Sequence, residues 1–400
     1  MRKDWEYKKL GECFHYIKNG ANIKQVKGAG GYPITRIETL SGGVFNRNRM
    51  GYADVYDIEK YQDYILENGD LLLSHINSKS YIGRTVEYRS RNTEIIIHGM
   101  NLLRIKNNSD VISSSFFAYY ANSHKFKSDI ARIRKDAVNQ SSLSITDLKK
   151  IHVPLPPKPT QLAIVAELDK INELIQLKKQ QLKDYDQLAQ SIFYEMFGDP
   201  VENEKGWEVK KLGDICEVTS AKRVFIEEVV DSGVPFIRGT ELTALNRLTR
   251  GEKMEYSLFI TKEHYERLKA ITGVPKYGDL LIPSINSEGI AWIVNTEEPL
   301  YFKDGRVLWV HVNQDVFKSE CLQKIMNILL KHTYKSMGGA TFSELKLFVL
   351  RELKVPIPPI ESQQQFAARI EAIVRQKQQV SETIKDLETL LASRMQYWFD

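Results

Sequence analysis

The most constraining feature of this 400-residue sequence is that it is written twice. The motif WEYKKLGE at residues 5–12 recurs as WEVKKLGD at 207–214. The proline-rich run VPLPP at 153–157 recurs as VPIPP at 355–359, and both repeats are 202 residues apart. A repeat of this length predicts two copies of one structural unit rather than a single continuous domain.

The two copies agree at their ends and differ in the middle. GDLLLSHINS at 69–78 returns as GDLLIPSINS at 278–287, now 209 residues apart, so the second copy gains seven residues and later loses them, as surface loops allow. The stretch 81–101 shares little with 290–307. This pattern favours a common scaffold that presents two different recognition surfaces; drift in unimportant loops is the alternative.

Each copy is predicted to be a mixed α and β body. The runs at 93–105, 290–294 and 307–312 are short, β-branched or aromatic, and bounded by Gly, Asn or Asp, as strands are. The stretch 113–133 has apolar residues near helical spacing and begins with a run of serines able to cap a helix, and 319–337 is its counterpart. The predicted class is therefore α+β, with two globular bodies related by duplication.

A long heptad pattern follows each proline-rich run. Five consecutive heptads hold in each copy, with charged residues at Lys178, Lys377 and Arg394. The pattern predicts two helices that form a coiled coil, each roughly 55 to 60 Å long at 1.5 Å per residue. An ordinary amphipathic helix packed on its own body is the alternative. The expected seam consists of Ile164, Leu168, Ile171, Ile175, Leu182, Tyr185 and Ile192, and of Phe366, Ile370, Ile373, Val380, Ile384, Leu387 and Leu391.

The prolines are expected to set the boundary between body and helix. Pro154, Pro156, Pro157 and Pro159 should stop helix and strand, fix extended backbone and leave a proline near the first helical turn. A ligand for an SH3-type domain is the alternative for such a run. The resulting boundaries are 1–155 for the first body, 156–198 for the central helix, 199–357 for the second body and 358–400 for the last helix.

Composition excludes several classes of protein. Lys and Arg number 56 against 51 Asp and Glu, and this net charge of +5 permits a polyanionic partner without requiring one. Cys13, Cys216 and Cys321 are an odd number with no close pair, which favours reduced thiols in the cytoplasm over a disulfide frame, and a zinc site would need more ligands at tighter spacing. No apolar run is long enough to span a membrane, so we expect a soluble, unexported chain with no membrane partner.

Motifs for catalysis are not recognisable in the sequence. There is no phosphate-binding Gly-x-x-x-x-Gly-Lys-Ser/Thr loop, no His-Glu-x-x-His and no Asn-Pro-Pro-aromatic motif, and the eight histidines are scattered. We therefore expect a non-catalytic chain with no catalytic residue and no metal site.

The opening motif, the GDLL segment, the Val-Pro-x-Pro-Pro run and the helix after it, each present twice, resemble the DNA-specificity subunit of Type I restriction-modification systems. The resemblance covers essentially the whole chain. It implies that each body is a target-recognition domain, and that the two helices pair antiparallel as a spacer with a pseudo-twofold axis. The family often has Glu-Gln at the helix start, where this chain has Thr160-Gln161 and Ser362-Gln363, which leaves the capping of the helices open.

The resemblance also implies the partners. These are double-stranded DNA, two methyltransferase subunits and the restriction (motor-nuclease) subunits, with S-adenosylmethionine, ATP and Mg used only in the partner subunits. Because the two bodies differ, the expected target is an asymmetric sequence of two parts whose gap the helices set. Two alternatives stay open: the specificity subunit of a combined methyltransferase-nuclease polypeptide, and a coiled-coil scaffold that binds no DNA.

Candidate DNA-contacting residues follow from the chemistry of DNA. Arg most often contacts guanine and Asn adenine, whereas Lys mainly holds phosphates. The candidates are Lys24, Lys27, Arg36, Asn77, Lys79, Arg84, Lys135 and Asn139 in the first copy, and Lys222, Arg223, Arg238, Asn286, Ser287, Lys335 and Thr341 in the second. Arg36 and Arg238 are matched across the copies, which suits a structural role as well as a reading role.

Overall fold

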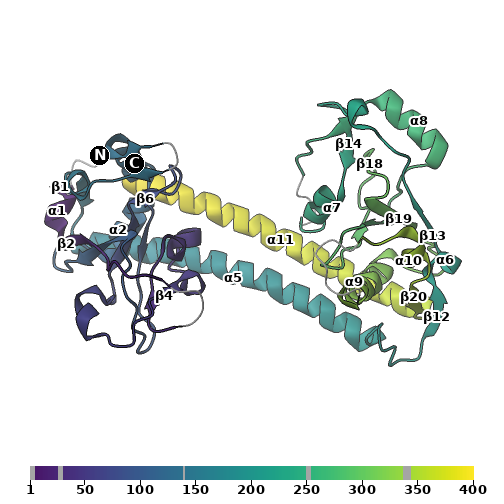
Figure 1. Ribbon diagram of the computed structural model, residues 1–400, viewed down its shortest axis with the longest axis horizontal. Coiled ribbons are helices and arrows are strands. Elements are labelled where there is room, and N and C mark those ends of the chain that lie inside the picture. Colours follow the sequence, from purple (N-terminus) through teal and green to yellow (C-terminus); the bar gives the residue numbers. More distant parts are fainter. Residues whose placement is uncertain (1–4, 26–29, 138–139, 249–253, 337–343) are drawn as a thin grey trace. The chain divides into compact units, whose positions relative to one another are not determined.

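The computed structural model describes residues 5–25, 30–137, 140–248, 254–336 and 344–400 (Figure 1). The candidates Lys27, Asn139 and Thr341 lie outside these ranges. The chain divides into two compact units. Unit 1 comprises residues 1–176 and 385–400, and unit 2 comprises 177–384. Each unit therefore contains one globular body, called body 1 and body 2 below, and about half of each long helix.

Body 1 is built on a four-stranded antiparallel sheet. Its strands, in spatial order, are β2 (Phe14–Asn19), β8 (Leu102–Asn107), β5 (Leu71–Ser74) and β7 (Thr85–Glu87). Side chains of this sheet share a hydrophobic core with α2 (Ser114–Asn122) and α3 (His124–Ile133). The stretch 113–133 forms two helices because Ser123 adopts an extended conformation and its Oγ accepts a hydrogen bond from Phe126 N at 3.2 Å, which caps α3.

Body 2 repeats the same sheet. Its strands, in spatial order, are β13 (Glu217–Ser220), β19 (Val307–His311), β16 (Leu280–Pro283) and β17 (Trp292–Ile293). One longer helix, α9 (Ser319–Ser336), packs on this sheet in place of α2 and α3. The matching strand order confirms the common scaffold that the sequence repeat predicts.

The remaining elements differ more between the bodies. Body 1 has a second sheet of order β6-β10-β9, whereas body 2 has one of order β15-β14-β18. In body 1 these smaller elements are α1 (Leu10–Cys13), β3 (Pro33–Ile34), η1 (Ile37–Gly43), η2 (Arg47–Arg49), β4 (Gly51–Tyr52), η3 (Glu59–Tyr64), β6 (Ile76–Asn77), β9 (Lys135–Asp136), β10 (Ser141–Ser142) and α4 (Ile145–Leu148). In body 2 they are α6 (Leu212–Ile215), η4 (Ile226–Glu228), β14 (Val234–Ile237), α7 (Gly239–Leu245), β15 (Phe259–Ile260), α8 (Lys262–Thr272), β18 (Tyr301–Phe302) and α10 (Leu347–Arg351).

In both bodies the opening motif pairs with the proline-rich run. Strand β1 (Glu6–Lys9) is antiparallel to β11 (His152–Leu155), with Tyr7 opposite Pro154. Strand β12 (Glu208–Lys211) pairs in the same register with β20 (Lys354–Ile357). The expectation that the prolines exclude a strand is therefore wrong at Pro154. A two-stranded ribbon has an unpaired outer edge on each strand, where a missing N–H removes no ladder bond.

The two long helices lie side by side and antiparallel. Helix α5 spans Lys158–Phe197 and α11 spans Ile360–Phe399 (Figure 1). In unit 1 Arg394 pairs with Glu167, and in unit 2 Lys377 Nζ lies 2.6 Å from Asp186 Oδ1, so charged seam positions are satisfied across the helix pair. All fourteen predicted seam residues are buried or half-buried. The coiled-coil prediction is confirmed.

The last residue of a long helix contributes to the hydrophobic core of each body. In unit 1 the ring of Phe399, the last residue of α11, packs 5.5 Å from Phe116 and 5.8 Å from Tyr120. In unit 2 Phe197, the last residue of α5, packs 5.3 Å from Phe366 and belongs to the core of body 2. Phe197 and Phe399 are 202 residues apart, so the duplication extends to this contact. Among the residues that the structure describes, no helix is both long and apolar enough to cross a membrane.

Candidate nucleic-acid interface

The second sheet of body 1 joins two segments that the sequence analysis singled out separately. Asn77 in β6 lies opposite Ser141 in β10, and Lys135 in β9 lies opposite Ser142. Across this sheet Lys79 Nζ is 3.3 Å from Asp136 Oδ2. Asn77, Lys79 and Lys135 are therefore neighbours on one small sheet, although nearly sixty residues of sequence separate the first from the last.

Asp136, in the edge strand β9, accepts hydrogen bonds from several neighbours. It accepts hydrogen bonds from Ser141 Oγ at 2.7 Å and from Arg134 Nε at 2.8 Å. These bonds and the nearby Lys79 lower the pKa of Asp136 to about 2, so its charge offsets part of the charge of Lys79 and Arg134. Lys135 is exposed, and the structure gives it no carboxylate partner among the described residues. Residue chemistry selected Lys135 individually in this segment, but not the neighbouring Arg134.

Arg84 joins this group through Ser74. Ser74 N donates to Arg84 O at 2.9 Å, and Asn77 Nδ2 donates to Ser74 Oγ at 3.1 Å. The Arg84 guanidinium lies 4.4 Å from the centre of the Tyr81 ring, and its Nη1 donates to Leu40 O at 3.3 Å. Tyr81 is 46% exposed. An exposed aromatic ring beside a cation suits contact with unpaired nucleotides, and sequence reasoning missed it.

Arg36 and Lys24 complete the candidate surface of body 1. Arg36 precedes η1, where its backbone N donates to Thr39 Oγ1 at 2.8 Å, and its guanidinium is 3.4 Å from Glu38. A Cβ at Gly51 would lie 2.9 Å from Arg36 Cδ and 2.6 Å from Gln25 Oε1, so both side chains lie over this glycine. Lys24 precedes Gln25 and is exposed. Through η1, which carries Leu40, this group adjoins Arg84.

In body 2 the candidate residues lie near the turn between β18 and β19, residues 303–306. Two backbone groups of the turn donate hydrogen bonds, Lys303 N to Ile237 O (2.9 Å) and Gly305 N to Ser220 Oγ (3.0 Å). Just before the turn, Tyr301 Oη in β18 accepts a hydrogen bond from Lys222 N (2.9 Å). The turn therefore lies where β13 and β14 end. Lys222, Arg223 and Arg238, which follow those two strands, come together around it.

Three arginines of this surface are paired with carboxylates. The pairs are Arg223 Nε with Asp304 Oδ2 (3.2 Å), Arg238 Nη2 with Glu241 Oε1 (2.5 Å) and Arg306 Nη1 with Glu344 Oε1 (3.4 Å). Sequence reasoning missed Arg306 and the neighbouring Lys303. Both lie in the diverged stretch 290–307, where the repeat offered no counterpart to compare.

Asn286 differs from the other candidates because it is buried, with 4% of its surface exposed. Its Nδ2 donates to Ile290 O at 2.6 Å, and its Oδ1 accepts from Ile290 N at 2.6 Å. The amide thus closes the 286–290 loop, and a base contact would require both bonds to break. Ser287 beside it is exposed, as is Lys335 in the last turn of α9.

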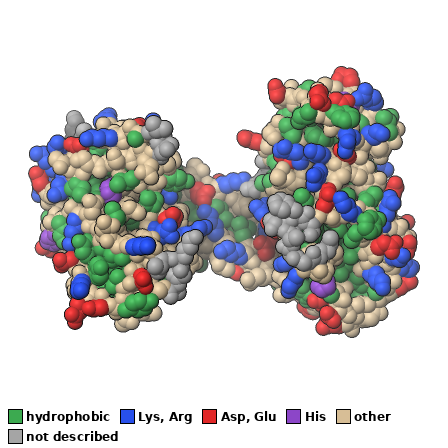
Figure 2. Space-filling view, viewed as in Figure 1, with side chains coloured by type: hydrophobic (Ala, Val, Ile, Leu, Met, Phe, Trp, Pro, Cys, Tyr) green, Lys and Arg blue, Asp and Glu red, His purple; other side chains and the backbone are tan. Residues whose placement is uncertain are grey.

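The surface charge is mixed. On the face shown in Figure 2, Lys and Arg side chains are interspersed with Asp and Glu in each unit. This agrees with the ion pairs above, in which most interface arginines have a carboxylate within reach. Any recognition of DNA would therefore depend on where individual cations point rather than on one large basic field.

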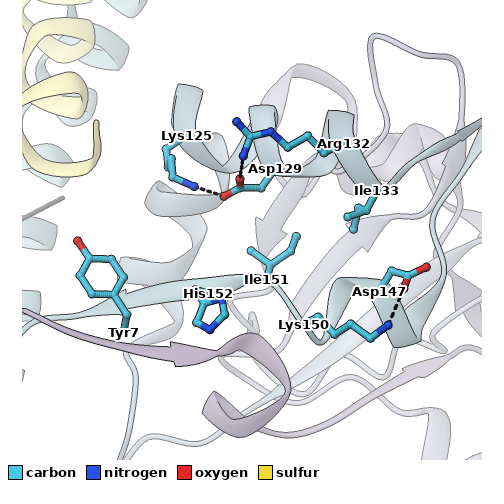
Figure 3. Close-up of a pocket in the computed structure, with 9 residues that line it drawn as sticks. All are labelled: Tyr7, Lys125, Asp129, Arg132, Ile133, Asp147, Lys150, Ile151 and His152. Atoms are coloured by element: carbon cyan, nitrogen blue, oxygen red, sulfur yellow. Dashed lines mark hydrogen bonds and ion pairs between the residues drawn. The ribbon is translucent and has the colours of Figure 1, made fainter.

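A pocket in unit 1 lies apart from the candidate DNA-contacting residues of body 1. This pocket of about 550 Å³ lies between α3, α4 and the β1–β11 ribbon (Figure 3). Its charged side chains pair with one another: Asp129 with Lys125 and with Arg132 (3.2 Å), and Asp147 with Lys150 (3.0 Å). None of the candidate DNA-contacting residues lines it. Within the described ranges, no group of three or more His, Cys, Asp or Glu is placed to hold a metal ion.

Comparison with known proteins identifies the family. A family model described as the Type I restriction modification DNA specificity domain matches residues 2–184 and again residues 204–389. The chain belongs to this family. The two matches cover the two copies of the repeat, so the family assignment extends to both bodies and to most of both helices.

Similar proteins agree over almost the whole chain. The putative type I restriction enzyme MjaX specificity subunit of Methanocaldococcus jannaschii is 28% identical over 97% of this chain and 93% of its own length. The putative type I restriction enzyme specificity subunit S.HindORF215P of Haemophilus influenzae is 23% identical over 91% of this chain and 86% of its own.

Two solved structures share the fold. The S subunit of a Type I restriction-modification system from M. genitalium has a TM-score of 0.52 at 15% identity, over 98% of this chain and 95% of that one. A chain from a structure describing complex assembly and conformational transition of the type I R-M system has a TM-score of 0.59 at 16% identity, over 100% of this chain and 98% of that one.

Proposed function

We propose that this chain is the specificity subunit that reads an asymmetric, two-part DNA sequence, with one half-site for each body. The observation that carries this proposal is that two bodies with the same four-stranded sheet place different side chains around it. Body 1 presents Arg36, Arg84 and the sheet with Lys135, whereas body 2 presents cations around the 303–306 turn. Equal scaffolds with unequal surfaces suit two different half-sites.

The chemistry of the surfaces suits duplex DNA. Exposed lysines such as Lys135 and Lys222 supply the phosphate contacts that give affinity and depend on salt. The guanidinium groups of Arg36, Arg84 and Arg238 are able to contact guanine in the major groove. In this proposal the two antiparallel helices would act as the spacer that sets the gap between the half-sites.

The proposal assigns the chemistry to partner subunits. Two methyltransferase subunits and the restriction subunits would assemble on this chain and would use S-adenosylmethionine, ATP and Mg. A base within a duplex must leave the stack to be methylated, so a subunit that grips both flanking half-sites suits that reaction. This chain would act as reader and platform and catalyse no step itself.

The test is selection of bound duplexes from a random library by the chain copurified with its methyltransferase partner, at several salt concentrations. We expect one enriched motif with two conserved blocks, and an affinity that falls steeply as salt rises. Binding to no duplex at any salt concentration would refute the proposal and favour a scaffold that binds only proteins. A partner that both methylates and cleaves would reveal a fused enzyme instead.

A further inference from the structure

Two arginines of body 2 are held from beneath by carboxylates. The Arg238 side chain is 43% exposed and its partner Glu241 only 10%. Arg223 is 67% exposed and its partner Asp304 only 21%. In both pairs the acid lies deeper than the cation, so the guanidinium stands between its carboxylate and solvent.

The Glu241 carboxylate accepts four hydrogen bonds, three of them from Arg238. It accepts hydrogen bonds from Arg238 N (3.1 Å), Arg238 Nε (3.1 Å), Arg238 Nη2 (2.5 Å) and Thr240 Oγ1 (2.9 Å). Burial would raise the pKa of Glu241, but the bonds from Arg238 and Thr240 overcome it and lower the pKa to about 2. The carboxylate is therefore ionised at neutral pH, and it fixes both the backbone and the side chain of Arg238.

The carboxylates bind only part of each guanidinium group and leave N–H groups that could bind a ligand. Arg238 binds Glu241 through Nε and one Nη2 hydrogen, and Arg223 binds Asp304 through Nε alone. Among the described residues, no hydrogen-bond acceptor contacts Nη1 or Nη2 of Arg223. In Arg238, Nη1 likewise contacts no acceptor among these residues, and Nη2 contacts Glu241. The Nη1–Nη2 edge of a guanidinium carries two parallel N–H groups, the geometry that reads guanine O6 and N7.

Body 1 lacks this arrangement at the matched position. Arg36 also precedes a helical turn, but the residue three positions later is Thr39 instead of a glutamate. Among the residues that the structure describes, the guanidinium of Arg36 pairs only with Glu38, at 3.4 Å, and that carboxylate is itself 55% exposed. The same arginine is therefore rigidly held in body 2 and loosely held in body 1.

We propose that Glu241 and Asp304 are positioning residues that aim Arg238 and Arg223 at guanines of the half-site read by body 2. This inference rests on the proposed function. A guanidinium that is already ordered loses less side-chain entropy when it meets a base, and it favours the one base whose acceptors match its direction. Glu241 and Asp304 thus sharpen discrimination between bases more than they change overall affinity.

The competing explanation is that the two carboxylates only mask positive charge. The two explanations predict different results when the carboxylate is replaced by a neutral amide. A masking carboxylate, once neutralised, leaves a freer cation that binds every duplex more tightly. A positioning carboxylate, once neutralised, leaves an arginine that tolerates the wrong base pair at one position.

The experiment measures binding of the complex with its methyltransferase partner to a panel of duplexes, each changed at one base pair of the selected motif. The variants are Glu241→Gln, Arg238→Lys, which keeps the charge but loses the paired donors, and Asp304→Asn. The control is Glu352→Gln, which removes an exposed ion pair with Lys211 (2.7 Å) at the end of β12 and makes the same change in net charge.

We expect Glu241→Gln and Arg238→Lys to lose about tenfold discrimination at the same G·C base pair, in one half-site only. Asp304→Asn should relax a different base pair of that half-site, and it serves as the deciding variant if Glu241→Gln fails to fold. Glu352→Gln should leave every position unchanged. Uniform tightening on all duplexes, unchanged discrimination, or relaxation in both half-sites would overturn the inference. A wild-type complex that binds no duplex would instead refute the proposed function.

Discussion

Gln161 and Gln363 hold the same buried position in the two halves of the molecule. The Oε1 of Gln161 accepts from Ser113 N at 2.8 Å and its Nε2 donates to Pro156 O at 3.0 Å. Gln363 makes the same bonds with Lys318 N at 2.9 Å and Pro358 O at 2.8 Å. One side chain therefore ties the first turn of the long helix to the proline-rich run and to the start of the main helix of the body.

Replacing Gln161 by alanine should destabilise unit 1 by about 2 to 4 kcal/mol, because buried backbone groups lose their partners. Chemical denaturation of the full chain measures this change. The matched control is Gln176→Ala on the exposed face of the same helix, which should change the stability little. Equal effects of the two substitutions would show that Gln161 is not a junction residue.

The end of α11 should be a structural part of body 1. Phe399→Ala removes a ring that packs on Phe116 and Tyr120, and it should cost about 3 to 5 kcal/mol. Hydrogen exchange should show the loss of protection in the amides of β8. Leu390→Ala, at a position that is 45% exposed on the same helix, serves as the control. Unchanged protection of β8 in Phe399→Ala would contradict the contact.

Glu94 should make body 1 sensitive to acid. Its hydrogen bonds with Arg47 are the main cause that lowers its pKa from 4.5 to about 2. A carboxyl with a lowered folded-state pKa contributes stability above pH 4.5, and this contribution is lost as the pH falls from 4.5 towards 2.

The variant Arg47→Met should lower the free energy of unfolding by about 2 kcal/mol at neutral pH. It should also make this free energy depend less steeply on pH, as measured by denaturation between pH 5 and pH 2.5. Arg375→Met removes an exposed pair with Glu371 on α11 and should preserve the slope. A wild-type slope in Arg47→Met would assign the acid sensitivity to other carboxyls.

Lys135 and Lys222 should act on DNA through charge alone. Replacing either by glutamine should weaken binding to all duplexes alike, and should reduce the slope of log affinity against log salt by about 1. Lys150→Gln, beside the pocket in Figure 3, controls for net charge and should keep the slope. A loss confined to one base sequence would make the lysine a base reader instead.

Much of the architecture follows from the sequence because it depends on periodic or repeated features. The heptads predicted the seam of α5 and α11, and the 202-residue repeat predicted that both bodies have a common scaffold, which is a four-stranded sheet of the same strand order in each. The prolines misled because their effect depends on which edge of a strand is paired. Only the pairing of β1 with β11 reveals that Pro154 occupies a free edge.

The candidate site was less predictable because residues distant in sequence build it. Residue chemistry selected Asn77 and Lys135, but only the β6-β10-β9 sheet shows that they are neighbours. Lys303 and Arg306 lie in the diverged stretch, where no repeat marks them. Asn286 matches Asn77 in the repeat, yet its environment is different, since its amide closes a loop.

The central claim is that two different readers on one scaffold address one DNA sequence. Mapping of modified bases in the DNA of a cell that expresses this chain with its methyltransferase partner tests it most directly. The account predicts modification within a single asymmetric motif of two conserved blocks separated by a gap of constant length. Modification at a continuous palindrome would contradict it.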